Sequence, residues 1–91
     1  MRLGPFRREI DRIDLQLVRL LNRRAQLVLR IGELKRKQGL PIFDGRRESA
    51  VLQRAIQSNV GPLSPQSVRG IFREILRRSR RLQRKGRRPT E

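Results

Sequence analysis

The chain has 91 residues, of which 24 are Lys or Arg and 8 are Asp or Glu, for a formal charge of +16. It contains neither Cys nor His, which excludes disulfides, thiolate or histidine metal sites, and catalysis by a histidine base. The charge favours an anionic partner without naming it, and no stretch approaches the ~20 apolar residues of a membrane span or the pattern of a signal peptide. We therefore expect one domain of a cytoplasmic protein that needs neither metal nor cofactor.

The first predicted helix spans about residues 5–38 and carries a long apolar stripe. Pro5 opens it and Gly39 closes it, so it extends for about 50 Å. Its apolar residues follow steps of three and four, as on a face that packs against other helices. They are Ile10, Ile13, Leu17, Leu20, Leu27, Ile31 and Leu34. Arg24 occupies the one slot that breaks this series, so its guanidinium faces an anion, pairs with a carboxylate or reaches solvent.

Two shorter helices are predicted after it. Asp44 is expected to cap a helix over about residues 44–58, because an Asp side chain accepts hydrogen bonds from N–H groups of the first turn. A Ser-Pro pair opens the next helix, over about residues 64–84. Gly70 inside that helix costs about 1 kcal/mol relative to Ala, so we expect a neighbouring helix to pack closely on it.

The pattern predicts an all-α fold of three helices, one long and two shorter, with no strand signal. Helices of about 15 and 20 residues are too short to cover a stripe about 50 Å long. A second copy of the chain is the natural cover. We expect an intertwined homodimer whose long helices run side by side, with a three-helix monomer as the alternative.

Several residues could surround a small anion. Arg24 and Lys35 are three helical turns apart and share one side of the first helix, about 16 Å from each other. Arg7, expected in the first turn, lies about 25 Å from Arg24 along the axis, so it would serve the site of a partner chain. The other candidates are Asp44, Arg47 and Glu48 in one turn, and Ser79 and Gln83 on one face of the last helix. Each group also has an ordinary explanation as a cap, a solvated turn or polar surface.

Together and in this order, these residues resemble the all-helical chorismate mutases. The resemblance covers about residues 6–83 and is carried by the stretches REIDRIDLQLVRLLNRRAQLVLRIGELK, GLPIFDGRRE and FREILRRSRRLQ. It implies an isomerase that converts chorismate into prephenate in aromatic amino acid biosynthesis. That reaction is an intramolecular Claisen rearrangement, which needs no metal, cofactor, nucleophile or base, so the lack of His and Cys is no obstacle.

The resemblance also implies individual roles. Arg7 would reach across the dimer, and Arg24 would bind a substrate carboxylate in the pocket of its own chain. Lys35 and Gln83 would donate hydrogen bonds to the ether oxygen, where negative charge develops as the C–O bond breaks. The other implied substrate contacts are Asp44 and Glu48 near the ring hydroxyl, Arg47 lining the pocket, and Ser79 near a carboxylate. The residues expected to be catalytic are Lys35, Gln83, Arg24 and Glu48.

Other functions stay open at this point. An isochorismate pyruvate lyase of the same fold also clamps a dianion, but Lys35 and the group Asp44, Arg47 and Glu48 favour the mutase. A nucleic-acid-binding protein would explain the charge, although stacking aromatics are scarce and the basic residues form no recognisable module. A regulatory domain of a fused aromatic-pathway enzyme, or a complex with such an enzyme, is also open. The basic tail, residues 85–91, is expected to be disordered or to hook over the active site.

Overall fold

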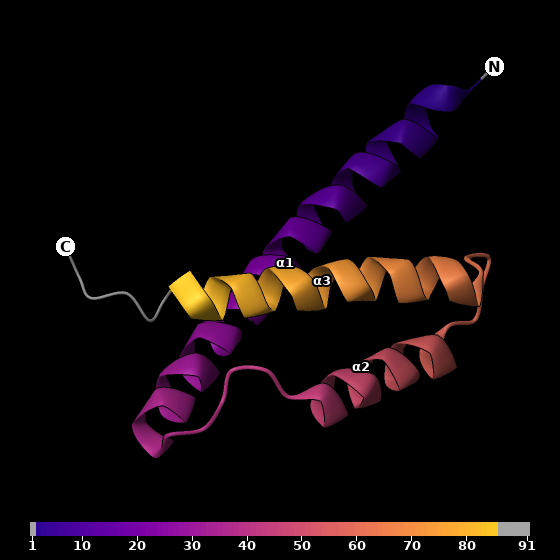
Figure 1. Ribbon diagram of the computed structural model, residues 1–91. Helices are drawn as coiled ribbons and strands as arrows, with labels where there is room; N and C mark the ends of the chain where they lie inside the picture. Colours follow the sequence, from indigo (N-terminus) through magenta and orange to yellow (C-terminus); the bar gives the residue numbers. More distant parts are fainter. Residues whose placement is uncertain (1, 86–91) are drawn as a thin grey trace.

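The computed structural model describes residues 2–85 and contains three α-helices joined by two loops (Figure 1). The helices are α1 (Leu3–Gln38), α2 (Gly45–Ser58) and α3 (Pro65–Lys85). Residues 2–85 contain no β-strand, in agreement with the expected all-α fold. Within the same stretch, no helix combines the length and the apolar character needed to cross a membrane. Within the described residues α3 extends through Lys85, and the rest of the expected tail, residues 86–91, lies outside them.

The helices begin and end close to the predicted capping residues. The Asp44 carboxylate accepts a hydrogen bond of 3.0 Å from the backbone N–H of Arg47, which makes it the N-cap of α2. Gly39 ends α1 in the left-handed conformation with φ of 68°, which a side chain would strain. The expectation that Pro5 opens α1 is wrong, because the helix begins two residues earlier. Proline is tolerated there because the first four N–H groups of a helix have no intrahelical partner. Arg7 therefore lies in the second turn instead of the first.

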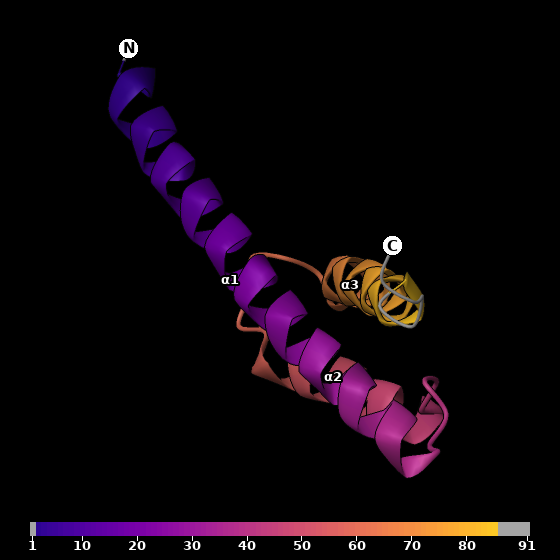
Figure 2. The same cartoon turned by 90° about the vertical axis from the view of Figure 1, so that its left-hand side faces the viewer.

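α3 packs against both α1 and α2. In Figure 1, α3 crosses α1 near its middle and α2 runs beside α3. The view from the side shows the N-terminal half of α1 projecting beyond the other two helices (Figure 2). The molecule is accordingly long and flat, with extents of 57 × 32 × 14 Å.

The chain buries few apolar side chains. Among residues 2–85, the buried apolar side chains are Ile42, Val68 and Leu76, and no large side chain is completely buried. The apolar stripe of α1 is instead about half exposed, with 54% of Ile10 and 57% of Leu27 accessible. The two shorter helices therefore leave the stripe uncovered over most of its length.

Gly70 is not a position of close packing in this chain, so that expectation is wrong. A Cβ atom built on Gly70 would have no heavy atom within 4 Å among the described residues outside its own turn. The reason is that α1 and α2 contact other faces of α3, and Gly70 faces a groove beside α2. The glycine is thus simply a residue of low helix propensity on an exposed face.

Candidate active site

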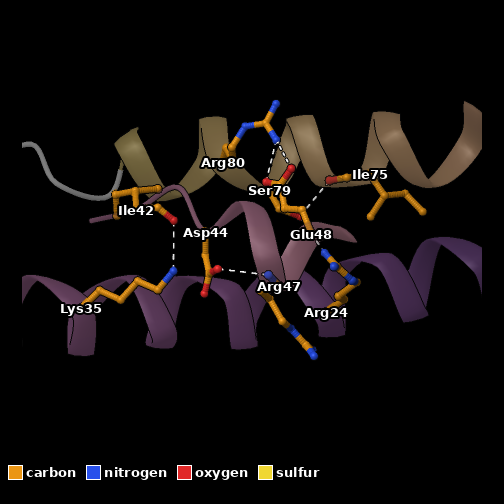
Figure 3. A network of polar contacts seen from close by, with 9 residues as sticks. All are labelled: Arg24, Lys35, Ile42, Asp44, Arg47, Glu48, Ile75, Ser79 and Arg80. Carbon is orange, nitrogen blue, oxygen red and sulfur yellow. Dashed lines mark hydrogen bonds and ion pairs between the residues drawn. The ribbon is translucent and has the colours of Figure 1, made fainter. Parts of the chain in front are cut away.

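A cavity of about 250 Å³ lies where the three helices meet. Its polar lining combines Arg24 and Lys35 of α1, Arg47 and Glu48 of α2, and Ser79 and Gln83 of α3. Its apolar lining consists of Leu27, Val28, Ile31, Ile42, Val51 and Leu76. The chain thus brings together six of the eight residues singled out in the sequence, from segments far apart along it. Figure 3 shows all of these six except Gln83.

Arg24 points from the apolar stripe of α1 toward α3. Its Nη1 atom donates a hydrogen bond of 2.6 Å to Ser79 Oγ, and the Ser79 hydroxyl in turn donates to the carbonyl oxygen of Ile75 at 2.8 Å. Within residues 2–85, no carboxylate comes within ion-pair distance of this half-buried guanidinium. Of the alternatives drawn from the sequence, pairing with an acid of the described chain is therefore excluded. The remaining N–H groups of Arg24 stay available to an anion in the cavity.

Lys35 joins α1 to the loop before α2. Its Nζ atom donates a hydrogen bond of 3.0 Å to the carbonyl oxygen of Ile42, whose side chain is buried. An ammonium group has three N–H donors, so two remain after this bond. The contact therefore holds the ammonium group at the cavity and also fixes the loop that leads into α2.

Gln83 is the buried polar side chain of the site, with 7% of its surface exposed. Its Nε2 atom donates a hydrogen bond of 2.9 Å to the carbonyl oxygen of Val28 on α1. The amide nitrogen carries a second N–H, which this bond leaves free. Gln83 thus holds a neutral donor in a fixed direction in the wall of the cavity.

Glu48 is paired with a residue that was not singled out in the sequence. Nη1 of Arg80 lies 2.5 Å and 2.6 Å from the two carboxylate oxygens of Glu48, in a half-buried ion pair. The guanidinium of Arg80 also lies 5.6 Å from the ring centre of Phe43, in a cation–π arrangement. The signal that could have found Arg80 is weak, because α3 carries many arginines and any of several could meet the single acid of the first turn of α2.

Two of the predicted residues do not line the cavity. Asp44 is exposed, and its carboxylate caps α2, the ordinary explanation given for it above. Arg7 lies on the projecting half of α1, about 25 Å along the axis from Arg24. Within one chain, Arg7 is therefore too far away to touch a small molecule bound beside Arg24.

The charge of the cavity suits a small dianion. Three of its lining residues, Arg24, Lys35 and Arg47, are cations, and its one carboxylate, on Glu48, is already paired with Arg80. Because the site is partly enclosed, its charges are less screened by water than they would be on an open surface. The cations of the cavity can bind two carboxylates of one ligand, and the amide of Gln83 can donate a hydrogen bond to a further polar group of the same ligand.

Comparison with known proteins agrees with this geometry. Residues 6–84 match the family described as chorismate mutase type II. The bifunctional chorismate mutase/prephenate dehydratase of Aquifex aeolicus is 44% identical over 78 residues, which cover 81% of this chain and 22% of that protein. The chain spans about a fifth of the length of this relative and of similar curated relatives.

Two solved structures share the fold along nearly the whole chain. A chorismate mutase (form II) from Thermus thermophilus has a TM-score of 0.90 and 34% identity, covering 99% of this chain and 100% of that one. The chorismate mutase from Helicobacter pylori, solved in complex with prephenate, has a TM-score of 0.87 and 30% identity, covering 98% of this chain and 97% of that one. Because the family match and the structural matches cover most of the chain, it belongs to the type II chorismate mutases, which confirms the resemblance noted in its sequence.

Proposed function

We propose that this chain rearranges chorismate into prephenate. The observation that carries the proposal is one cavity in which Arg24, Lys35 and the buried amide of Gln83 stand together. Chorismate carries two carboxylates and an ether bond, so it requires cations at its carboxylates and a donor at the ether oxygen. Membership of the type II family supports the same reaction, and the Helicobacter pylori relative was solved with prephenate.

The chemistry needs little from the protein beyond geometry and charge. The ether C–O bond breaks while a C–C bond forms within the same molecule, with no proton transfer and no covalent intermediate. Holding the substrate in a compact, chair-like conformer removes the rotational freedom that slows the reaction in water. Donors fixed at the ether oxygen favour the transition state over the ground state, because negative charge grows there as the bond stretches.

Arg24 is the residue we assign to a substrate carboxylate. Its direction is set by Ser79, which accepts from Nη1 and uses its own proton on the carbonyl of Ile75. Ser79 in this proposal acts mainly by holding the guanidinium, which presents its remaining N–H groups to the carboxylate. Arg47, in the same cavity, adds positive charge for the dianion.

Lys35 and Gln83 are the donors we assign to the ether oxygen. Each is tied to a backbone carbonyl by one N–H, Lys35 to Ile42 and Gln83 to Val28, and each retains at least one further N–H. Donors fixed before the substrate arrives need no reorganisation during the reaction, which is the condition for effective electrostatic catalysis.

Glu48 is the acceptor we assign to the ring hydroxyl of the substrate. It is the one carboxylate in the lining of the cavity, and an ionised carboxylate only accepts hydrogen bonds. Asp44 supports it indirectly, because its cap fixes the first turn of α2, which carries Glu48. The two acids at the start of α2 therefore have different roles, since Asp44 caps the helix and Glu48 faces the cavity.

The complete enzyme in this proposal is an intertwined homodimer. The apolar stripe is about half exposed on the part of α1 that projects beyond the other helices (Figure 2). Its length and its apolar character support the proposal that it is a dimer interface. A groove of about 490 Å³ shares Arg24, Arg47 and Val51 with the cavity and continues over Val68 and Phe72, which suits an apolar helix of a second copy. Arg7 on that helix is the residue we expect to enter the partner's site.

The bifunctional relatives support one kind of partner. Their printed names join chorismate mutase to prephenate dehydratase, an activity that consumes the product proposed here. We therefore infer that an enzyme acting on prephenate is the partner class to examine for this chain.

The proposal is tested by adding purified protein to chorismate and following the loss of its absorbance, with prephenate identified as the product. Arg24→Ala protein, checked for helical content by circular dichroism, serves as the control, since it loses the carboxylate contact. No turnover at micromolar protein would refute the proposal. Release of pyruvate from isochorismate would instead identify a lyase.

A further inference from the structure

Glu48 separates two hollows of the molecule. It lines the cavity described above and also an outer groove of about 410 Å³ between α2 and α3. Arg80 lines the outer groove and not the cavity. Its Nη1 atom contacts both oxygens of the Glu48 carboxylate, as the dashed lines in Figure 3 show. The carboxylate is therefore held from the side of the outer groove.

The pair is fixed more firmly than an ordinary surface ion pair. The Arg80 and Glu48 side chains are 26% and 20% exposed, so solvent screens their attraction only in part. Phe43 lies on another side of the guanidinium, 5.6 Å from ring centre to Cζ, and limits the rotamers open to Arg80. Lys35 of α1 holds the loop before α2 by its hydrogen bond to the Ile42 carbonyl. Phe43 lies in that loop, and Glu48 lies in the first turn of α2 that follows it.

Arg80 leaves room for a ligand on the same carboxylate. The two oxygens of an ionised carboxylate offer about four acceptor positions. Nη1 of Arg80 uses one on each oxygen, and the others remain for a hydroxyl group in the cavity. The ion pair therefore orients Glu48 without occupying it.

The alternative partners of Glu48 are the cations of the cavity itself. Arg24, Lys35 and Arg47 line the same space and carry no ion pair among residues 2–85. A Glu48 carboxylate released from the outer groove would be drawn to them by the attraction between opposite charges. It would then compete with a dianionic substrate for the groups that bind it.

We propose that Arg80 is a positioning residue that holds the Glu48 carboxylate away from the substrate-binding cations and directs it at the substrate's ring hydroxyl. The inference rests on the proposed function, because it concerns the binding of chorismate in that cavity. Arg80 touches no substrate atom and acts through Glu48. Its loss therefore affects substrate binding first, so KM rises more than kcat falls.

The test compares KM and kcat for chorismate in four variants, after turnover by the unaltered protein has established the proposed function. Arg80→Met keeps the length of the side chain and removes its charge, and we expect KM to rise about tenfold to a hundredfold. Arg80→Lys is expected to stay within about threefold of the unaltered protein, because a single nitrogen makes both contacts and an ammonium group can replace it. The double variant Arg80→Met, Glu48→Gln is expected to have a lower KM than Arg80→Met alone, because the competing charge is gone.

Arg77→Met is the matched control. Arg77 lines the same outer groove but pairs with Glu74 of its own helix. The pKa of Glu74 is held below its ordinary value by hydrogen bonds from Arg78 and Arg77, so this pair forms a separate charge cluster. We expect KM and kcat of Arg77→Met to stay within about twofold, because exposed ion pairs contribute little.

An Arg80→Met protein with unchanged KM, or a double variant no better than Arg80→Met, would overturn the inference while leaving the proposed function intact. If Arg80→Met is unfolded by circular dichroism at the assay temperature, Phe43→Leu decides the question. That variant loosens Arg80 and keeps its charge, so KM is expected to rise about twofold to fivefold. An unchanged KM in Phe43→Leu would then overturn the inference.

Discussion

The side-chain amide of Gln83 on α3 donates a hydrogen bond of 2.9 Å to the carbonyl oxygen of Val28 on α1. The bond requires the two helices to approach closely, and Gly32, one turn after Val28, provides the space. A Cβ atom on Gly32 would lie 3.3 Å from Cγ of Gln83. The direction of the proposed ether-oxygen donor therefore depends on the absence of a side chain on another helix.

Gly32→Ala is expected to lower kcat by about tenfold, because the added methyl group pushes Gln83 away from its position and a misplacement of about 1 Å can cost a hundredfold. Alanine has the higher helix propensity, by up to about 1 kcal/mol, and this gain opposes the cost of displacing Gln83. The free energy of unfolding should therefore change little. Steady-state kinetics and thermal unfolding of the same preparation check both parts. An unaltered kcat would contradict the dependence on Gln83 position.

Gly70→Ala is the matched control for Gly32→Ala. A Cβ on Gly70 meets no heavy atom of the described chain within 4 Å outside its own turn, so the substitution adds helix propensity without a clash. We expect the free energy of unfolding to rise by up to about 1 kcal/mol and kcat to stay the same. Thermal unfolding and the chorismate assay measure the two effects. A loss of stability would reveal that a second chain packs on this glycine.

The helices could be predicted because their signals are local. A cap such as Asp44, a left-handed terminus such as Gly39 and a stripe of fixed period each depend on neighbours in the sequence. The site is different. The bond from Arg80 to Glu48 joins residues 32 positions apart, and α3 presents several arginines of equal local merit. Only the packing of α3 beside α2 selects Arg80, and that arrangement is set by tertiary contacts.

The structure differs from the prediction at two helix positions, Gly70 for a tertiary reason and Pro5 for a local one. A glycine inside a helix is unfavourable and therefore predicts close packing at Gly70, but which face of α3 is covered depends on how α1 and α2 are placed. Pro5 predicts a helix start near residue 5, but any position of the first turn accepts proline, so this local signal defines the start only to within a few residues.

Gln83→Glu is expected to make activity depend on acid pH. Only a protonated carboxyl group can donate to the ether oxygen, and the protonated form is present below its pKa and lost as pH rises through it. A kcat profile against pH measures this, with the unaltered protein as reference. A profile as flat as the reference would contradict the assignment of Gln83 as donor.

Lys35→Ala is expected to lower kcat by about a hundredfold to a thousandfold, the range for loss of one preorganised donor at a developing negative charge. The hydrogen bond to the Ile42 carbonyl is lost too, so melting temperatures must accompany the kinetics. Lys37→Ala is the control, because Lys37 lies in the same last turn of α1, is exposed and does not line the cavity. Equal rates for Lys35→Ala and the unaltered protein would remove Lys35 from the mechanism.

Mixing two inactive variants tests whether Arg7 serves the partner's site. Arg7→Ala and Arg24→Ala chains are each expected to be inactive alone, since every site of either homodimer lacks one arginine. In a mixed dimer, the Arg7→Ala chain keeps its own Arg24 and receives Arg7 from its partner, so one of the two sites is complete. Equal amounts of both chains, unfolded and refolded together, should therefore regain about a quarter of the activity of the unaltered protein, because half of the dimers are mixed. Refolded mixtures that stay inactive, while the unaltered protein refolds to full activity, would mean that Arg7 does not cross between chains.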